Sequence, residues 1–395
     1  MKAILPLFAA LALALAPAGQ AAAAKETPAR SVASKASKPA KAAKAKSAGK
    51  KTKASRKRAA TSGKAVQAAT RIDYDGEHHN FLEWEAVRTF IDEMGTRHGF
   101  ERAALETLFG QARFIDSAVQ LVKPAPPGKP KNWQVYRTRF IEPIRIAAGV
   151  RFWDEHAQAL ERAEAVYGVP AEVIVGIIGV ETIYGRDTGK FRVLDTLATL
   201  AFAYPEAPNR AGRMAFFRSE LANTLLFARE HGVDPFSLLG SFAGAIGMPQ
   251  FMPGSILDYG VDFDGDGQLD LRNSAEDAIG SVANFLVKHG WNPEHKGSPV
   301  YPAEVSPSRA WEPLRERGLA ATLTPEELRT AGVESVEALP PQGLYGVVDL
   351  QNGADPTEYW VANDNFFAIT KYNRSYFYAM SVVELGRAVR AARAG

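Results

Sequence analysis

The stretch PAEVIVGIIGVETIYG, residues 170–185, predicts a short and very apolar helix. Pro170 suits the first position of a helix, and Gly185 suits the position just after its end. Glu181 shares one face of this helix with four apolar residues that precede it by three to eight positions: Val173, Ile174, Ile177 and Ile178. The pattern predicts an apolar side chain at position 181, where the chain carries a carboxyl group instead.

A carboxyl group at that position should be largely removed from water. Burial disfavours its charged form and raises its pKa toward the operating pH, and a carboxyl that holds its proton at neutral pH can act as a general acid. Glu172 lies on the opposite face, where we expect an exposed first-turn carboxylate that complements the helix dipole. Glu181 is therefore the catalytic candidate. The structural alternative is that it caps a neighbouring loop or pairs with Arg186 or Arg192.

Apolar residues recur at helical spacing through most of the chain from residue 72 onward. Three such series are Trp84, Val87, Ile91 and Met94, then Met214, Phe217, Leu221, Leu225 and Ala228, and finally Tyr378, Val382, Leu385 and Val389. Glycines follow five candidate helices: Gly95, Gly168, Gly185, Gly232 and Gly290. We expect a mainly α (α+β) globule.

The composition of the sequence changes between residues 292 and 359, where prolines are frequent and the helical periodicity of apolar residues is interrupted. The segments LYGVVDL and TEYWVAN flank a turn-rich QNGADP, which predicts a β-hairpin. We therefore expect an α domain and catalytic core in 72–291, a small β-containing insertion in 292–359, and a helical return to the core in 360–395.

The amino terminus has the layout of an export signal. Residues 1–24 contain one lysine, an apolar stretch and then small residues, which is typical of a cleaved signal peptide. The apolar stretch is shorter than the roughly 20 residues that a membrane span needs. The chain has no Cys, so disulfides, thiol chemistry and a lipid-anchoring cysteine are excluded. We expect a soluble periplasmic protein without a transmembrane anchor, and a monomer.

Residues 25–71 form a segment rich in Ala, Lys and Arg, with fifteen basic residues and one acidic residue. With Lys2 counted, the net charge of +3 for the whole chain leaves −12 for residues 72–395. So few branched and aromatic side chains predict a disordered linker. It is either a solvated spacer or a means of adhering to an anionic envelope surface. Nucleic acid is the usual target of such runs, but an exported protein seldom meets it.

Several long blocks carry a family resemblance. They are GIIGVETIYGRDTGKFRVLDTLATLAF from residue 176, GSFAGAIGMPQFMPGS from 240, VDFDGDGQLDL from 261, DAIGSVANFLVKHGW from 277 and ITKYNRSYFYAM from 369. In this order they closely resemble the lytic murein transglycosylase B family, over most of the chain from about residue 132 onward. The resemblance implies a lysozyme-like helical catalytic core with its glycan groove above the helix that carries Glu181.

The resemblance also implies a reaction. Glu181 matches the single catalytic carboxylate of the family, which cleaves the β-1,4 bond between N-acetylmuramic acid and N-acetylglucosamine and leaves a 1,6-anhydro end. Such chemistry needs one residue that acts first as acid and then as base, and no cofactor. Most glycosidases instead use two carboxylates. A lysozyme-type hydrolase and a non-catalytic, calcium-dependent wall-binding protein remain as alternatives.

Other positions match residues that line the family's groove: Ser241, Gln250, Phe251, Tyr136, Tyr372, Asn373 and Tyr378. Aromatic faces suit sugar rings, and amides can hold acetamido groups. Taken alone, each tyrosine would more often be a core or surface residue than a sugar contact, and the Gly- and Ala-rich block could be a tight packing turn. Phe285 stands where the family commonly has a tyrosine, so a hydroxyl contact with the glycan is lost there.

The loop DFDGDGQLDLRN resembles a calcium loop. Asp262, Asp264 and Asp266 occupy positions 1, 3 and 5, and Gln268 occupies position 7, where the backbone carbonyl is the ligand. Position 12 is Asn273 rather than Glu, so a strict EF-hand fails. The resemblance implies Asp277 as the closing ligand and a structural Ca²⁺ in an EF-hand-like loop, residues 262–277. Alternatively, Asp277 is a helix N3 residue after an N-cap at Ser274, and the ion could be sodium or absent at low calcium.

Motifs of other enzyme classes are missing from the sequence. No HExxH, GxSxG, Walker or dinucleotide-binding pattern is present. Zinc peptidases, serine hydrolases and nucleotide-dependent enzymes therefore have no support.

Overall fold

A computed structural model describes residues 80–124 and 130–395 of the chain. The expected signal peptide (1–24) and basic linker (25–71) lie outside the described residues. All described residues belong to one compact unit, which includes the catalytic candidate and the β-containing region.

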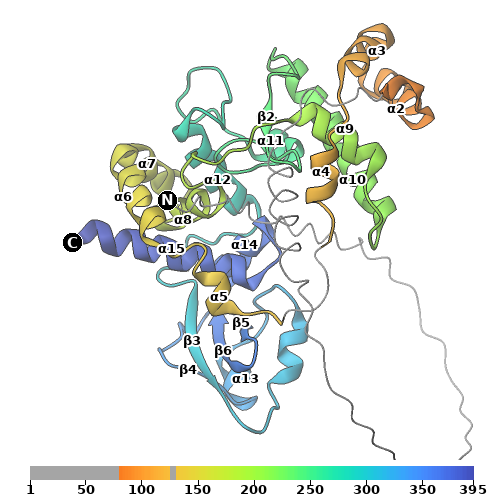
Figure 1. Ribbon diagram of the computed structural model, residues 1–395. Helices are drawn as coiled ribbons and strands as arrows, with labels where there is room; N and C mark the ends of the chain where they lie inside the picture. The colour runs from red at the N-terminus through yellow and green to blue at the C-terminus, as the bar shows by residue number, and fades with distance from the viewer. Residues whose placement is uncertain (1–79, 125–129) are drawn as a thin grey trace, which may run out of the picture. The chain divides into compact units, whose positions relative to one another are not determined.

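Helices dominate the described residues, as the sequence predicts (Figure 1). They are η1 (Phe81–Glu83), α2 (Glu85–His98), α3 (Arg102–Gln111), α4 (Asp116–Leu121), α5 (Trp133–Arg137), α6 (Pro143–Glu155), α7 (Ala157–Tyr167), α8 (Ala171–Thr182), α9 (Val193–Ala203), α10 (Arg210–Glu230), α11 (Pro253–Tyr259), α12 (Ala275–Lys288), η2 (Glu312–Arg317), α13 (Pro325–Thr330), α14 (Asp364–Tyr372) and α15 (Tyr376–Ala394). The strands are β1 (Phe191–Arg192), β2 (Leu239–Gly240), β3 (Val300–Val305), β4 (Val333–Ser335), β5 (Gly346–Asn352) and β6 (Asp355–Ala362).

Helix α8 lies at the centre of the core and packs along α15. Two glycines allow the backbones to approach closely. A side chain at Gly176 would meet the carbonyl oxygen of Val382 at 2.3 Å, and one at Gly386 would meet that of Glu172 at 2.1 Å. Because neither position has room for a Cβ, small residues fix where the two helices cross. In Figure 1, α15 lies between helices α6 to α8 and the sheet β3–β6.

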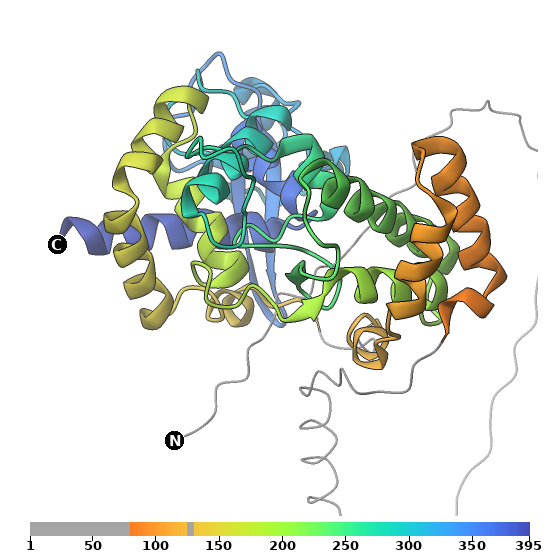
Figure 2. The same cartoon turned by 90° about the horizontal axis from the view of Figure 1, so that it is seen from above.

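Helices α2 to α4 form the opposite part of the described chain, beside α9 and α10 (Figure 2). The ring of Phe90 on α2 meets Phe202 on α9 edge-on at 6.0 Å. Arg229 on α10 donates to the carbonyl of His98 at 2.6 Å. These contacts attach the first helices to the helical core.

The β-containing region holds an antiparallel sheet with strand order β4-β3-β6-β5, and its strand β6 runs to Ala362, past the expected boundary at residue 359. The expected hairpin is present: β5 and β6 pair through Val347 with Val361 and Val348 with Trp360. The sheet has a small apolar core of its own, made of Tyr301, Trp311, Leu323, Leu328, Val333, Tyr345, Val347 and Val361.

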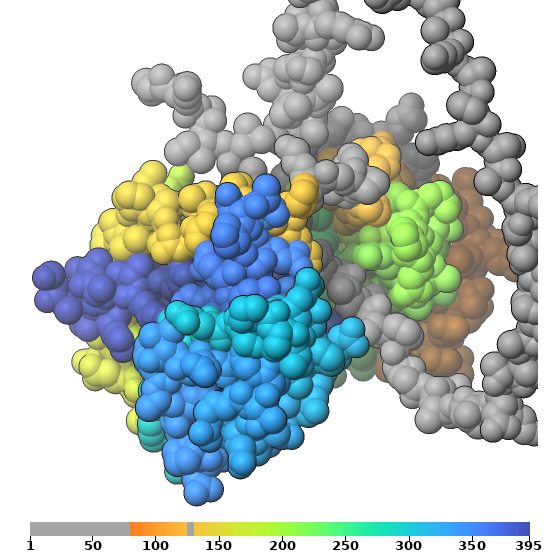
Figure 3. Space-filling model, turned by 90° about the horizontal axis from the view of Figure 1, so that it is seen from below, coloured from red at the N-terminus to blue at the C-terminus, as the bar shows by residue number. Residues whose placement is uncertain are grey.

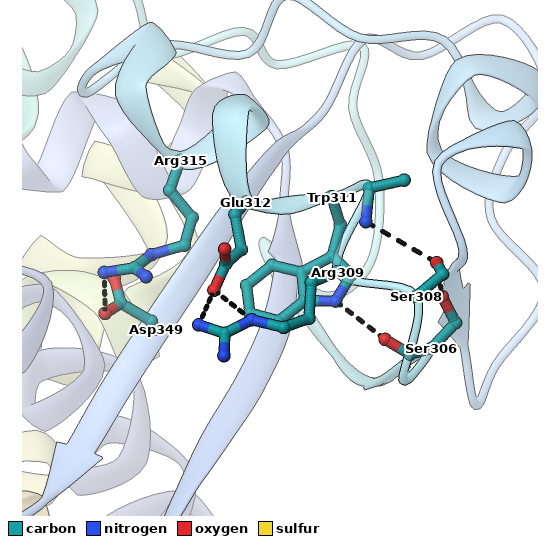
Figure 4. Close-up of polar contacts among 8 residues, drawn as sticks. Ser306, Ser308, Arg309, Trp311, Glu312, Arg315 and Asp349 are labelled. Atoms are coloured by element: carbon teal, nitrogen blue, oxygen red, sulfur yellow. Dashed lines mark hydrogen bonds and ion pairs between the residues drawn. The ribbon is translucent and has the colours of Figure 1, made fainter.

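A polar cluster holds the segment after β3 onto this sheet (Figure 4). The indole of Trp311 donates to the carbonyl of Ser306 at 3.0 Å, and Arg309 pairs with Glu312. Arg315 on η2 pairs with Asp349 on β5 at 2.9 Å. The cluster therefore holds the 3-10 helix η2 against the sheet.

The tip of the hairpin holds the segment that carries Tyr136. The amide of Asn132 donates to the carbonyl of Asn352 at 3.1 Å, and the backbone N–H of Gln134 donates to the side-chain oxygen of Asn352 at 3.1 Å. The N–H of Gly353 donates to the carbonyl of Lys131 at 2.9 Å. Figure 3 shows the blue surface of the hairpin against the yellow surface of α5.

Three sequence-based details were wrong. Gly95 lies inside α2, because the apolar face of Ile91 and Met94 carries that helix on to His98, and the left-handed residue that ends it is Gly99. Helix α8 begins at Ala171, with Pro170 as its N-cap rather than its first residue, and it ends at Thr182, where Ile183 rather than Gly185 caps it.

The third concerns Glu172, which is not freely exposed. Its carboxylate pairs with Arg390 on α15 at 2.7 Å. The reason is that α8 is enclosed by neighbouring helices on all sides, so even its second face meets protein.

Within residues 80–124 and 130–395, no single helix is both long and apolar enough to cross a membrane. Only the bent pair α7 and α8 passes that test, by length and composition alone.

Candidate active site

Glu181 and Tyr378 form the centre of the site. Glu181 lies in the last turn of α8, and the hydroxyl of Tyr378 donates to its Oε1 at 2.6 Å. Tyr378 is fully buried in the first turn of α15, where its N–H donates to the N-cap hydroxyl of Ser375. The packing of α8 on α15 therefore brings two residues that are 197 positions apart in the sequence into direct contact.

The surroundings of Glu181 favour its protonated form. Burial raises the pKa of Glu181 to about 7, while the hydrogen bond from Tyr378 and the positive charge of Arg145 act in the opposite direction. The residue is nevertheless only partly buried, which leaves part of its surface accessible to a substrate. The alternative pairing with Arg192 is absent, because Arg192 pairs with Asp195 at 2.5 Å.

Two more tyrosines adjoin this pair. The ring of Tyr372 stacks on that of Tyr378 at 6.1 Å, and its hydroxyl donates to the carbonyl of Pro249. Burial, followed by the charge of Glu181, raises the pKa of Tyr136 to about 12 and that of Tyr372 well above its usual value. All three phenols are therefore neutral hydrogen-bond donors at physiological pH.

Helix α8 is tied directly to the block that begins at residue 240. The hydroxyl of Thr182 donates to the carbonyl of Met248 at 2.8 Å. Gln250 follows with a left-handed φ of 52°, and its side-chain amide donates to the carbonyl of Gly247 at 2.9 Å. Ser241 is buried and accepts the N–H of Ala245 at 3.1 Å.

Aromatic rings link this block to α14. Phe251 lies 5.6 Å from Phe285 and 5.7 Å from Tyr372, measured between ring centroids. Phe285 lies 4.8 Å from Tyr372, so the position where the family commonly has a tyrosine belongs to this cluster. Asn373 lies in the turn between α14 and α15, where its carbonyl accepts the N–H of Ser375 at 2.6 Å. Tyr136, Tyr372 and Tyr378 thus lie near Glu181, and Phe251 adjoins Tyr372. Ser241 and Asn373 make the hydrogen bonds given above within their own turns.

The aspartate loop brings together three of the predicted metal ligands. Carboxylate oxygens of Asp262, Asp264 and Asp277 all lie within 4.8 Å of one another, and oxygen donors in this arrangement fit a hard cation such as Ca²⁺. Asp266 accepts the N–H of Gln268 at 2.7 Å and is exposed, outside that group of three.

Asp277 has the position of a helix N3 residue, and it also belongs to the group of three carboxylates. It is the N3 residue after the N-cap Ser274, whose hydroxyl accepts the Asp277 N–H. Its carboxylate also accepts the N–H groups of Phe263 and Asp270, each at 2.8 Å.

Arg145 and Thr182 are two residues near Glu181 that the sequence did not predict. Arg145 lies on α6 in register with the buried Gly149 and Phe152, so a basic residue on an apolar helix face was the available signal. Thr182 gave no such signal, because its role depends on the placement of Met248.

Comparisons with known proteins bear on the site. Residues 83–387 match the family model described as the transglycosylase SLT domain. The membrane-bound lytic murein transglycosylase B of Escherichia coli is 44% identical over 316 residues, which cover 78% of this chain and 83% of that protein.

Solved structures of lytic transglycosylases are also similar to this chain. The soluble lytic transglycosylase SltB1 of Pseudomonas aeruginosa has a TM-score of 0.71 and 43% identity, covering 78% of this chain and all of that one. The lytic transglycosylase Slt35 of Escherichia coli, solved in complex with calcium, has a TM-score of 0.70 and 40% identity, covering 80% and 96%.

Proposed function

Because this chain belongs to the transglycosylase SLT domain family and is a peptidoglycan lytic transglycosylase, we propose that Glu181 is its single catalytic acid and base. Its substrate is the glycan strand of peptidoglycan, cut between N-acetylmuramic acid and N-acetylglucosamine. The observation that carries the assignment is a carboxyl group with a pKa raised to about 7 by burial, in contact with a neutral phenol donor.

The protonated carboxyl of Glu181 first gives its proton to the glycosidic oxygen, and the bond from that oxygen to C1 of the muramic acid breaks. The resulting carboxylate then takes the proton of the C6 hydroxyl of the same sugar, whose oxygen bonds to C1. Glu181 ends protonated as it began, no water is consumed, and the product carries a 1,6-anhydro end.

The tyrosines and amides around Glu181 supply the binding surface in this proposal. Tyr136 and Tyr372 offer aromatic faces for sugar rings, and the buried Phe251 packs against Tyr372 and supports it. Gln250 and Asn373 offer amides for the acetamido and hydroxyl groups of the strand. Tyr378 steadies the carboxylate after proton transfer, since a hydrogen bond to the charged form favours it.

The mass of the products tests this reaction. Purified glycan strands digested by the enzyme should give muropeptides lighter by one water than hydrolysed ends. Mainly reducing ends would support a lysozyme-type hydrolase instead. Full lytic activity in Glu181→Gln would exclude Glu181 as the acid, whereas no lytic activity in the wild type would favour a calcium-dependent wall-binding protein.

We also propose that Asp262, Asp264 and Asp277 hold a structural Ca²⁺ together with Asp266 and the carbonyl of Gln268. Three carboxylates so close would repel one another without a cation, and the similar Slt35 was solved with calcium. The ion would order the chain between α11 and α12 and take no part in the chemistry.

The proposed place of action is the periplasm. The signal-like residues 1–24 would direct export, and the absence of cysteine leaves no site for a lipid anchor on this chain. The basic segment 25–71 would attract the enzyme to anionic envelope surfaces. We propose that the enzyme works there as a monomer.

A further inference from the structure

Arg145 is a buried cation directed at the end of the catalytic helix. It extends from α6, with 8% of its surface exposed, and its Nη1 donates to the carbonyls of Gly179 and, at 3.2 Å, Val180. These are the two residues that precede Glu181 in the chain. Arg145 therefore contacts the backbone turn that positions the acid, without touching the carboxyl group.

The burial of this arginine is costly. Its Nε is buried without a hydrogen-bond partner, and the nearest carboxylate oxygen, Oε1 of Glu142, lies 3.9 Å away. A buried charge that is incompletely paired destabilises the folded protein, because its lost hydration is not fully replaced. A neutral donor would satisfy the same two carbonyls at lower cost, so the positive charge calls for an explanation beyond capping.

The helix end explains the need for a positive charge. Glu181 lies one residue before the end of α8, where unpaired carbonyls place partial negative charge and disfavour a carboxylate. The turn that follows is strained, because Ile183 and Tyr184 both adopt left-handed φ values, 53° and 58°. A cation bonded to the last carbonyls offsets the negative end and holds this turn.

The groups that face Glu181 come from four elements. Tyr378 from α15, Tyr372 from α14 and Tyr136 from α5 are neutral phenols, and Arg145 from α6 carries a charge. Among the groups of the described residues that influence Glu181, Arg145 is thus the source of positive charge.

We infer that Arg145 is a positioning residue for the proposed reaction, which fixes the last turn of α8 and stabilises the carboxylate that Glu181 becomes after giving up its proton. The inference rests on the proposed role of Glu181. It assigns Arg145 to the second half of the reaction, when the carboxylate must persist until the C6 hydroxyl is in place.

Three variants separate charge from capping. Arg145→Lys keeps the charge, Arg145→Gln keeps a donor for one carbonyl without the charge, and Arg145→Met keeps neither. Arg151→Met is the matched control, since Arg151 is an exposed arginine on the same helix. The measurements are kcat on soluble glycan strands from pH 5 to 9, the pKa of Glu181 from its carboxyl carbon NMR signal with Glu181→Gln as blank, and thermal melting.

We expect the alkaline limb of kcat and the NMR pKa of Glu181 to move up by roughly 0.5 to 1 unit in the Gln and Met variants. They should stay near the wild-type position in the Lys and Arg151→Met variants. At pH 6, kcat should fall roughly tenfold in Arg145→Met, in keeping with the loss of one charge-assisted contact. If Arg145→Met does not fold, Arg145→Gln still removes the charge.

An unmoved limb and NMR pKa in folded neutral variants would overturn the inference and leave Arg145 a structural cap. An equal shift in Arg145→Lys would do the same. The proposed function fails separately, if Glu181→Gln stays active whatever the Arg145 variants do.

Discussion

At the scale of single residues, opposing influences hold the pKa of Glu181 near neutral pH. Burial raises its pKa to about 7, and the phenol of Tyr378 and the charge of Arg145 limit the rise. A general acid works only while it holds its proton, so activity depends on this balance.

The pH dependence of activity follows directly. We expect kcat on glycan strands to fall as the pH rises through about 7, because Glu181 loses the proton that it must donate. A pH series of initial rates, with melting curves at each pH as the control for unfolding, measures this limb. A rate that is flat from pH 6 to 9 would contradict the assignment of Glu181 as acid.

The same group makes stability depend on pH. Its folded-state pKa of about 7 exceeds the ordinary value of 4.5, so the folded state binds the proton more tightly and stability is lost as the pH rises from about 4.5 to 7. The shift corresponds to at most about 3 kcal/mol.

Glu181→Gln, which cannot ionise, should therefore melt higher than the wild type at pH 8 and close to it at pH 4.5. Its lytic activity should be lost. Paired calorimetry at the two pH values measures the difference. Equal effects of the substitution at both pH values would mean that the carboxyl is well solvated.

At the scale of elements, the β5–β6 hairpin braces the helix that carries Tyr136. Asn352 is buried, and its side chain accepts the N–H of Gln134 and donates to Glu358 at 3.1 Å. The β-containing region therefore contributes to the site, because it holds the short helix α5, which carries Tyr136.

Asn352→Ala should loosen α5 without disturbing α8. We expect a loss of about 1–3 kcal/mol in unfolding free energy from the buried partners left unpaired. We also expect KM for glycan strands to rise several-fold while kcat changes little. Gln351→Ala, at the exposed neighbouring position on the same strand, is the matched control. A fall in kcat with unchanged KM would contradict a bracing role.

The aspartate loop is an element whose order should depend on a cation. Asp277 accepts the backbone N–H groups of Phe263 and Asp270. Because these hydrogen bonds involve protein groups alone, a chelator should lower the melting temperature rather than unfold the protein. A ligand at a hundred times its Kd stabilises by about 2.7 kcal/mol.

Melting curves with calcium and with chelator measure this effect. The double variant Asp262→Asn with Asp264→Asn should melt at the same temperature in both. Identical midpoints for the wild type at millimolar calcium and in chelator would count against an occupied site.

At the scale of the whole molecule, charge is divided sharply along the chain. Residues 25–71 carry +14 and residues 72–395 carry −12. Salt screens the attraction between the basic segment 25–71 and an anionic surface, with a Debye length of roughly 8 Å at physiological ionic strength.

Removing residues 25–71 should weaken binding to vesicles of anionic lipid at low salt and leave kcat on short soluble strands unchanged. Sedimentation with vesicles at two salt concentrations measures the binding, and vesicles of neutral lipid are the control. Equal sedimentation of the full chain and the shortened chain would mean that residues 25–71 are a spacer and do not bind the membrane surface.

The sequence by itself determined the helical class, the position of the hairpin and the anomalous carboxyl group. These features depend on local periodicity, turn residues and one misplaced polar side chain, all of which are visible along the chain. Family blocks identified the chemistry, and the comparisons confirm it at the level of the family.

Only the tertiary structure decided what surrounds Glu181. Tyr378 on α15 contacts its carboxyl group, Arg145 on α6 contacts the backbone just before it, and Asn352 braces α5 across more than 200 residues of sequence. Helical periodicity says which face of a helix is buried, but not which neighbour covers it. Here close approach at Gly176 and Gly386 sets the crossing of α8 and α15, which brings Tyr378 into contact with Glu181.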